Sequence, residues 1–201
     1  MMKTNAKARE TLRVFVALPL PEEAVEELAA LARRSRSAMP RGAVRWVRPE
    51  QMHLTLQFLG NVAADRIAAL QADLAAACRD APPFPLELAA PGAFPNARHP
   101  RVLWVGLGGD LERLGALQTR VAAACAPFLP APERGRFHPH LTLGRVKDDA
   151  RAVGDAWAGC PAPRAWRWRA GEVRLIQSVL QPTGAVHATL AAFPLSPSPA
   201  A

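Results

Sequence analysis

The sequence contains no tyrosine and only three lysines, Lys3, Lys7 and Lys147, although 25 of its 201 residues are lysine or arginine. Arginine therefore carries nearly all of the positive charge, and the formal net charge is +8. A high-GC genome also favours arginine over lysine, but it does not by itself set the sign of the net charge. Because guanidinium groups bind phosphate oxygens in pairs, the excess modestly favours a polyanionic partner such as nucleic acid.

Cysteine is also scarce. Cys78, Cys125 and Cys160 are odd in number and far apart, without C-x-x-C spacing, so neither a disulfide framework nor a zinc site is expected. No stretch approaches the roughly 20 apolar residues of a membrane-spanning helix. The apolar run 14–18 near the N-terminus is short for a signal peptide and is followed by prolines. We therefore expect a protein of the reducing cytoplasm with no membrane partner.

Half of the residues are hydrophobic, which excludes general disorder and supplies enough apolar material for a core. We expect a flexible N-terminus over residues 1–10, a single domain of two lobes over residues 11–195, and a disordered tail over residues 196–201. Apolar spacing predicts helices that begin near residues 21, 67, 111 and 148, with strands between and after them. The order, strand–helix–strand–helix twice over with extra strands, indicates an α+β protein rather than a doubly wound parallel sheet.

The tetrapeptide His-Leu-Thr-Leu occurs twice, at residues 53–56 and at residues 140–143. Side chains alternate between the two faces of a strand, so each histidine shares a face with the threonine two residues later, and the leucines face the other way. A single H-x-T segment is usually only the polar face of a half-buried strand. Because the whole context is repeated, we interpret the segments near 53–58 and 140–146 as matching motif strands that face each other across a cleft.

Two histidines across a cleft can act as a general acid and a general base, because imidazole has an unperturbed pKa near 6.5. Each threonine hydroxyl lies roughly 6.8 Å along the same strand face, where it can donate a hydrogen bond to an oxyanion. In-line displacement at phosphorus needs this combination. A base activates the attacking oxygen, an acid protonates the leaving oxygen, and donors stabilise the charge on the phosphate.

These motifs make the chain similar to the two-histidine (2H) phosphoesterase superfamily. More closely, it resembles the bacterial 2′-5′ RNA ligase family, whose members are also described as RNA 2′,3′-cyclic phosphodiesterases. The resemblance covers almost the whole chain, namely the segments 13–21, 46–60, 94–96, 101–106 and 137–146, the Leu-x-Pro-x-Gly pattern at 180–184, and Phe-Pro-Leu at 193–195. It implies a bilobal catalytic domain, with two pseudo-symmetric antiparallel sheets and outer helices around a central cleft.

The resemblance also implies a role for each matching residue. His53 would donate a proton to the leaving ribose oxygen, and His140 would accept the proton of the attacking water. Thr55 and Thr142 would hold phosphate oxygens. Arg145 would contact the phosphate, although strict alternation places it on the opposite face from the histidine, so this role requires a bulge or a strand end near residue 144.

The implied reaction opens a terminal 2′,3′-cyclic phosphate to a 2′-phosphomonoester without a metal or any other cofactor. We expect the enzyme to be a monomer. The substrate would be an RNA end or a small 2′,3′-cyclic nucleotide. Run backwards with a 5′-hydroxyl end, the same chemistry is ATP-independent 2′-5′ ligation. Neither the physiological substrate nor the physiological direction follows from the sequence.

The other histidines carry weaker signals. His138 shares strand parity with His140, but only His140 is followed two residues later by a threonine, and Pro139 indicates that His138 enters from a loop. The family tends to have a tyrosine near the position of His187, which this chain lacks. No role is assigned to His187 or to His99.

Three alternative functions remain. A metal hydrolase could use His53, His138 and His140, although neither motif contains an acidic residue of the kind that such sites usually recruit. An ATP-dependent ligase would need a nucleophilic lysine in a nucleotide-binding context, and no G-x-x-x-x-G-K loop is present. A non-catalytic RNA-binding module would use the same basic surface without the chemistry.

Overall fold

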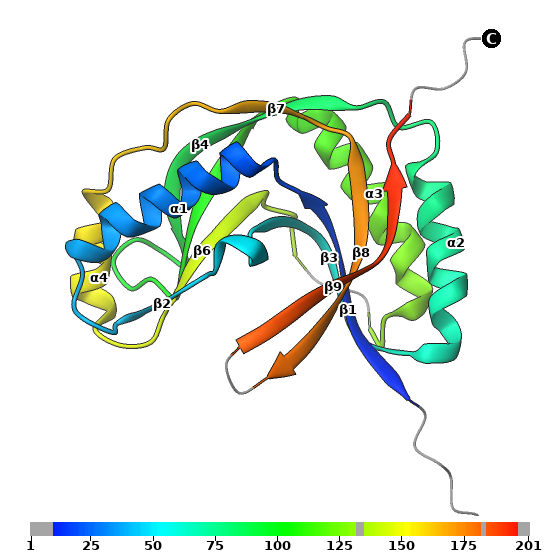
Figure 1. The fold of residues 1–201 in the computed structure, drawn as a ribbon, viewed down its shortest axis with the longest axis horizontal. Coiled ribbons are helices and arrows are strands. Elements are labelled where there is room, and N and C mark those ends of the chain that lie inside the picture. Colours follow the sequence, from blue (N-terminus) through cyan, green and yellow to red (C-terminus); the bar gives the residue numbers. More distant parts are fainter. Residues whose placement is uncertain (1–9, 132–134, 182–183, 197–201) are drawn as a thin grey trace, which may run out of the picture.

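The computed structural model describes residues 10–131, 135–181 and 184–196, and its fold is α+β (Figure 1). The strands are β1 (Thr11–Pro19), β2 (Val44–Trp46), β3 (His53–Ala63), β4 (Phe84–Phe94), β5 (Val102–Gly109), β6 (His140–Val146), β7 (Arg167–Ala170), β8 (Glu172–Gln181) and β9 (Gly184–Pro194). The helices are α1 (Glu22–Ser37), α2 (Ile67–Cys78), α3 (Leu111–Cys125) and α4 (Ala150–Ala158), with single 3-10 turns at Pro49–Gln51, Ala64–Arg66 and Ala126–Phe128. The predicted helix starts are confirmed to within two residues.

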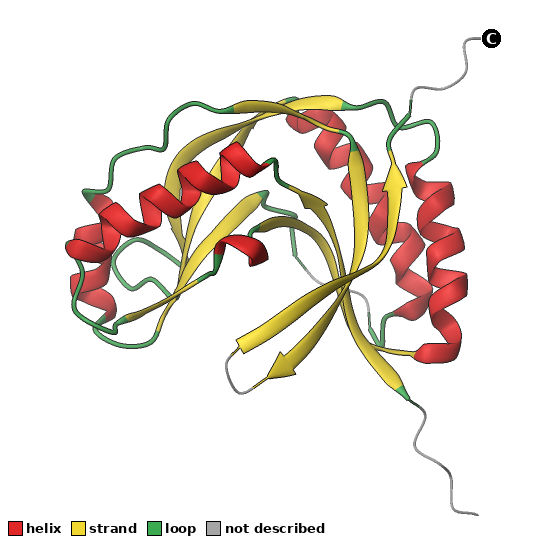
Figure 2. Cartoon of the chain, viewed as in Figure 1, coloured by secondary structure: helices red, strands yellow, loops and turns green. Residues whose placement is uncertain are grey.

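The strands of the described residues form a curled antiparallel sheet in the order β7-β4-β5-β6-β3-β1-β8-β9, and β2 pairs with β6 outside this path. The order is symmetric about the contact between β3 and β6, so that β5 corresponds to β1, β4 to β8 and β7 to β9. A single residue pair, Leu54 opposite Leu141, defines the register between β3 and β6. The predicted fold of two similar antiparallel halves is confirmed (Figure 2). The Leu54–Leu141 pair joins the two halves edge to edge.

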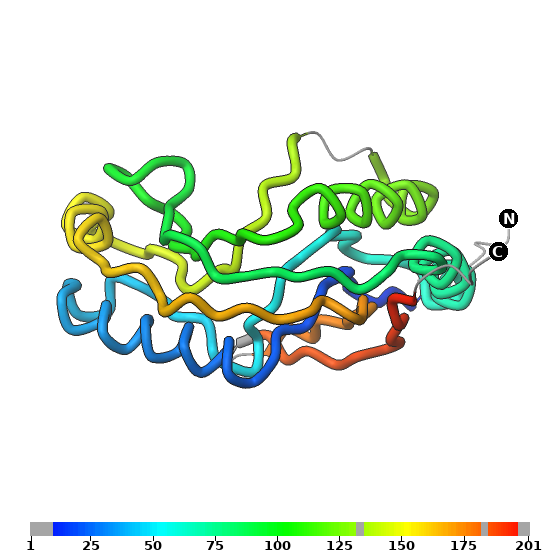
Figure 3. Tube along the Cα trace, turned by 90° about the horizontal axis from the view of Figure 1, so that it is seen from above, coloured from blue at the N-terminus to red at the C-terminus, as the bar shows by residue number. Residues whose placement is uncertain are grey.

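Helices flank both halves of the sheet. In Figure 1, α1 and α4 lie at the end that contains β2, whereas α2 and α3 lie together at the other end. Seen from above, α1 and α3 lie on opposite sides of the strands (Figure 3). Each helix buries one stripe, for example Leu28 and Leu31 in α1, and Leu117 and Val121 in α3. α3, which follows β5, packs against β3 of the other half and so helps to hold the two halves together.

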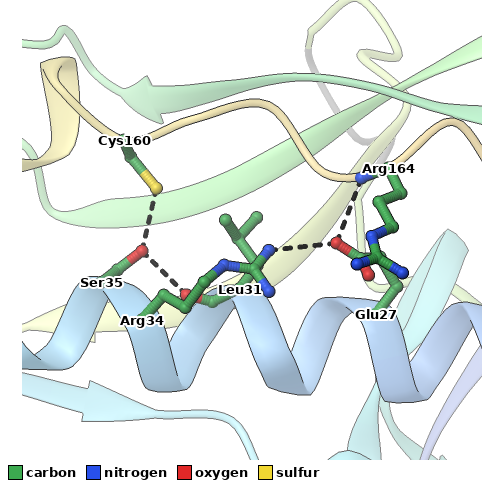
Figure 4. A network of polar contacts seen from close by, with 6 residues as sticks. All are labelled: Glu27, Leu31, Arg34, Ser35, Cys160 and Arg164. Atoms are coloured by element: carbon green, nitrogen blue, oxygen red, sulfur yellow. Dashed lines mark hydrogen bonds and ion pairs between the residues drawn. The ribbon is translucent and has the colours of Figure 1, made fainter.

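The start and end of α1 follow from local sequence. Pro21 precedes the helix, acidic residues occupy its first turn and arginines its last turn, as the helix dipole favours. The Ser35 hydroxyl donates to the Leu31 carbonyl at 2.9 Å, so the Cys160 thiol donates to the Ser35 hydroxyl oxygen, also at 2.9 Å (Figure 4). Cys160 is thus a contact between α1 and the segment after α4, and all three cysteines are free.

A second contact of α1 with this segment is ionic. The Glu27 carboxylate accepts from the Arg34 guanidinium and from the backbone N–H of Arg164, each at 3.1 Å (Figure 4).

The predicted flexible ends, residues 1–10 and 196–201, lie almost wholly outside the described residues. Within the described part of the chain, no helix is both long and apolar enough to cross a membrane.

Candidate active site

The two repeated motifs are neighbours at the centre of the sheet. Because the leucine pair that joins β3 to β6 is antiparallel, His53 lies on the Thr142 side of this pair and Thr55 lies on the His140 side. These four side chains are half-buried on one face, and the leucines are buried on the other. The two histidines are therefore diagonally related across this pair. The motif strands share one face beneath a cavity rather than forming its opposite walls.

A matching bulge interrupts each motif strand three residues after its histidine. The bulge residue in β3 is Leu56, which the register of β3 with β1 skips. The bulge residue in β6 is Leu143, which the register of β6 with β5 skips. An extra residue reverses the alternation beyond it. Phe58 and Arg145, each five residues after the motif histidine, are therefore exposed and line the same cavity as the histidines. The bulge that the role of Arg145 required is present.

A cavity of about 450 Å³ lies over this face and is called the reactive cavity below. Its walls include side chains from β1, β2, β3, β6, β8 and β9. It brings together every residue that the sequence singled out for the site, which are His53, Thr55, His140, Thr142 and Arg145. Residues far apart in the sequence thus meet at the line where the two halves of the sheet join.

Three arginines and no carboxylate are among the described residues that line the reactive cavity. The arginines are Arg13, Arg45 and Arg145, and none of them forms an ion pair with a described acidic residue. Arg45 is directly opposite Arg145 in the pairing of β2 with β6. Like charges that are directly opposed destabilise a sheet. An anion in the cavity would neutralise this repulsion, so the cavity suits a phosphate group.

The ring of His53 is held between aromatic side chains. It stacks on Phe15 at a centroid distance of 4.7 Å and meets the edge of His187 at 5.5 Å. Burial and then the nearby His187 lower the pKa of His53 from 6.5 to about 4, although a hydrogen bond to the backbone of Gln51 opposes the shift. In the free protein His53 is therefore neutral near pH 7.

The ring of His140 is held in a corresponding way on the other half. It contacts Phe94 edge-on at a centroid distance of 5.0 Å, and its Nδ1 lies 2.7 Å from the backbone carbonyl oxygen of His138. A carbonyl oxygen can only accept, so Nδ1 carries the hydrogen and the Nε2 lone pair of the neutral ring is free. Burial lowers the pKa of His140, and the hydrogen bond to His138 opposes this effect. The neutral ring can thus accept a proton at Nε2.

The remaining histidines have different positions. His138 lies in the loop before β6, as predicted, and supplies the carbonyl that orients His140. His187 in β9 lines the reactive cavity beside His53, and burial lowers its pKa, as does the charge of Arg48. His99 is exposed in the loop between β4 and β5 and lines no cavity near the motifs.

Sequence reasoning missed several cavity residues. Phe58 could have been found from the repeat, because it occupies the position in the first motif that Arg145 occupies in the second. Arg45 and Phe15 carry no such signal, since only strand pairing places them beside the motif strands. In the described chain, no group of three or more His, Cys, Asp or Glu could hold a metal ion. The metal-hydrolase alternative therefore lacks a donor set among these residues.

Comparison with known proteins identifies the family of this chain. Residues 19–181 match the family described as the 2′-5′ RNA ligase superfamily. This chain belongs to that superfamily. A relative from Aeropyrum pernix, named RNA 2′,3′-cyclic phosphodiesterase, is 32% identical over 156 residues, which cover 73% of this chain and 84% of the relative. A relative of the same name from Archaeoglobus fulgidus is 30% identical, with 90% and 99% of the two chains covered.

Solved structures of superfamily members have the same fold. The structure of E. coli LigT complexed with 3′-AMP superposes with a TM-score of 0.76 at 29% identity and covers 92% of this chain and 99% of LigT. A Thermus thermophilus protein superposes with a TM-score of 0.73 at 28% identity, with the same coverage. The two-histidine phosphoesterase architecture is therefore shared along nearly the full length of this chain.

Proposed function

We propose that this protein is an RNA 2′,3′-cyclic phosphodiesterase that opens a terminal 2′,3′-cyclic phosphate to a 2′-phosphomonoester. The observation that carries the proposal is that His53 and His140, diagonally related across the Leu54–Leu141 pair, line one cavity with both motif threonines and three arginines. The names of the relatives from Aeropyrum and Archaeoglobus support it. The substrates are RNA ends or small 2′,3′-cyclic nucleotides, and the protein acts as a cytoplasmic monomer.

The reaction is an in-line displacement in which two protons move. Nε2 of His140 accepts a proton from water, and the water oxygen attacks phosphorus opposite the P–O3′ bond. As that bond breaks, the imidazolium of His53 donates its proton to O3′. The products are a free 3′-hydroxyl and a 2′-phosphomonoester. Each positioned proton transfer contributes about 10²–10⁴-fold to the rate.

The equatorial phosphate oxygens are held by groups that point into the reactive cavity. Thr55 and Thr142 donate from diagonally related positions on the shared strand face, and Arg145 reaches the same face because of the bulge in β6. Charge that develops on these oxygens is stabilised by donors that the sheet already holds in place. The arginines also attract the anionic substrate from solution.

Substrate binding favours the protonated form of His53 that the reaction needs, with the proton taken up from solvent. The free ring has a pKa of about 4 and is therefore mostly neutral at physiological pH. A bound phosphate anion favours the imidazolium and raises the pKa of the ring beside it. The general acid is therefore charged mainly in the complex. His140, with Nδ1 committed to a carbonyl, keeps Nε2 available as the base.

The proposal is tested with an RNA that ends in a 2′,3′-cyclic phosphate, incubated with the protein in EDTA and without ATP. We expect hydrolysis to an RNA that ends in a 2′-phosphate. A 3′-phosphate product would reverse the assignment of the leaving oxygen, and lack of turnover would contradict the enzyme function. If EDTA abolished the activity, the metal-hydrolase alternative would be favoured. With the same RNA and a second strand that has a 5′-hydroxyl end, we expect some 2′-5′ ligation, as the superfamily description suggests.

A further inference from the structure

A second cavity, of about 660 Å³, opens beside the reactive cavity. We call it the side cavity. The two cavities share Thr55, Phe58 and His140, whereas His53 lines only the reactive cavity. The walls of the side cavity are the C-terminal half of α3 with the turn that follows it, and the segment 135–138 that leads into β6. The side cavity therefore reaches His140, the base of the proposed reaction, but not His53, the acid.

In-line displacement gives this asymmetry a chemical meaning. The attacking and leaving oxygens lie on opposite sides of phosphorus, so the attacking group enters from the side of the base and the leaving ribose lies on the side of the acid. A water molecule occupies only about 30 Å³. The side cavity is far larger, and its volume falls within the range of about 300–1,000 Å³ that is typical of sites for small organic ligands.

We propose that the side cavity binds the 5′-hydroxyl end of a second RNA strand, which is the nucleophile of 2′-5′ ligation. This inference rests on the proposed function. The exposed Arg136 guanidinium offers a contact for the strand's phosphate, and the rings of Phe58 and Phe137 offer surfaces for base stacking. No acidic residue is among the described residues that line the cavity, so none of them repels the strand.

The ligation step balances without ATP. The O5′–H bond of the incoming strand breaks, its proton passes to Nε2 of His140, and O5′ forms a bond to phosphorus. The P–O3′ bond of the cyclic phosphate breaks, and the imidazolium of His53 gives its proton to O3′. The products are a 2′-5′ phosphodiester and a free 3′-hydroxyl, and the two histidines return to their starting states by exchanging protons with solvent. The side cavity thus decides whether water or a strand attacks.

The test uses two variants of the side cavity and two matched controls. Arg136→Glu reverses the charge at the wall, and Ala122→Phe fills space beside α3. The controls are Arg33→Glu, an exposed arginine of α1, and Ala123→Phe, an exposed residue of α3 that does not line the cavity. Each protein is assayed for hydrolysis of a 2′,3′-cyclic mononucleotide and for ligation of a cyclic-phosphate RNA to a 5′-hydroxyl RNA. Thermal unfolding verifies that each variant is folded.

We expect both cavity variants to lose about tenfold or more of ligation, the cost of one phosphate or stacking contact, while hydrolysis of the mononucleotide is unchanged. The controls should retain both activities. An equal loss of hydrolysis and ligation in Arg136→Glu would overturn the inference, as would unimpaired ligation in both cavity variants. If the unmodified protein hydrolysed the cyclic phosphate but performed no ligation, the inference of an acceptor site would be overturned while the proposed hydrolysis would stand. Absence of both reactions would overturn the proposed function.

Discussion

Arg45 and Arg145 lie directly opposite each other in the pairing of β2 with β6, on the face that lines the reactive cavity. Directly opposed like charges cost a sheet up to about 1 kcal/mol. Neither arginine forms an ion pair with a described acidic residue. The free protein therefore holds an uncompensated pair of positive charges where the proposed reaction places its phosphate.

Replacing Arg45 by alanine should remove the repulsion and part of the phosphate site together. We expect the free energy of unfolding of the free protein to stay unchanged or rise by a few tenths of a kcal/mol. The stabilisation that inorganic phosphate gives, measured as the shift in Tm at saturating phosphate, should become smaller. Arg33→Ala serves as a control on an exposed α1 position. A less stable Arg45→Ala protein with an undiminished phosphate shift would contradict the anion site.

Replacing either motif histidine should lower the catalytic rate much more than replacing His138. We expect His53→Ala and His140→Ala each to lower kcat for hydrolysis by about 10²–10⁴-fold, because each removes one proton transfer. His138→Ala keeps the backbone carbonyl that orients His140 and should retain most of kcat. Steady-state kinetics with a cyclic mononucleotide decides the point. A loss of the same size in all three variants would favour the metal-hydrolase alternative.

The pH dependence should differ between the free enzyme and the complex. Burial places the pKa of His53 at about 4 and lowers that of His140, so the charged form of His53 that the reaction needs is scarce in the free enzyme at neutral pH and increases as the pH falls. We therefore expect a bell-shaped kcat/KM with its maximum on the acidic side. Bound phosphate raises these pKa values, so the maximum of kcat should lie at higher pH.

Two measurements check the pH prediction. Steady-state rates between about pH 4 and 9 give both profiles, and NMR titration of the histidine rings with and without inorganic phosphate gives the direction of the pKa shift. A flat profile would argue against paired acid and base roles. A His53 ring whose pKa falls when phosphate binds would show that the anion does not lie beside it.

Phe58 should contribute to binding rather than to the chemical step. Its side chain is 54% exposed, lines both cavities and contacts the ring of Phe15 at a centroid distance of 5.8 Å. Phe58→Ala should raise KM for a cyclic mononucleotide by about fivefold or more, the loss of one stacking contact, with a smaller effect on kcat. Phe58→Leu keeps an apolar side chain without the ring, so its KM should lie between those of the unmodified protein and Phe58→Ala. A large fall in kcat at constant KM would exclude a stacking role.

The sequence by itself determined the parts of this protein that depend on local geometry. Alternation along an extended chain places His53 and Thr55 on one face, and the repeat predicts the same for His140 and Thr142. Helix starts were predictable for the same reason, since apolar spacing, prolines and acidic first turns act within a few residues. Family resemblance could add roles to residues but not their positions in space.

Only the tertiary structure decided which residues meet. The pairing of Leu54 with Leu141 sets the diagonal relation of the histidines, and it depends on how the halves pack rather than on either motif. Bulges that bring Phe58 and Arg145 to the site, and the pairing that sets Arg45 against Arg145, arise between strands distant in sequence. Covalent geometry fixes alternation, whereas register is selected by the burial of a whole face, which no single segment contains.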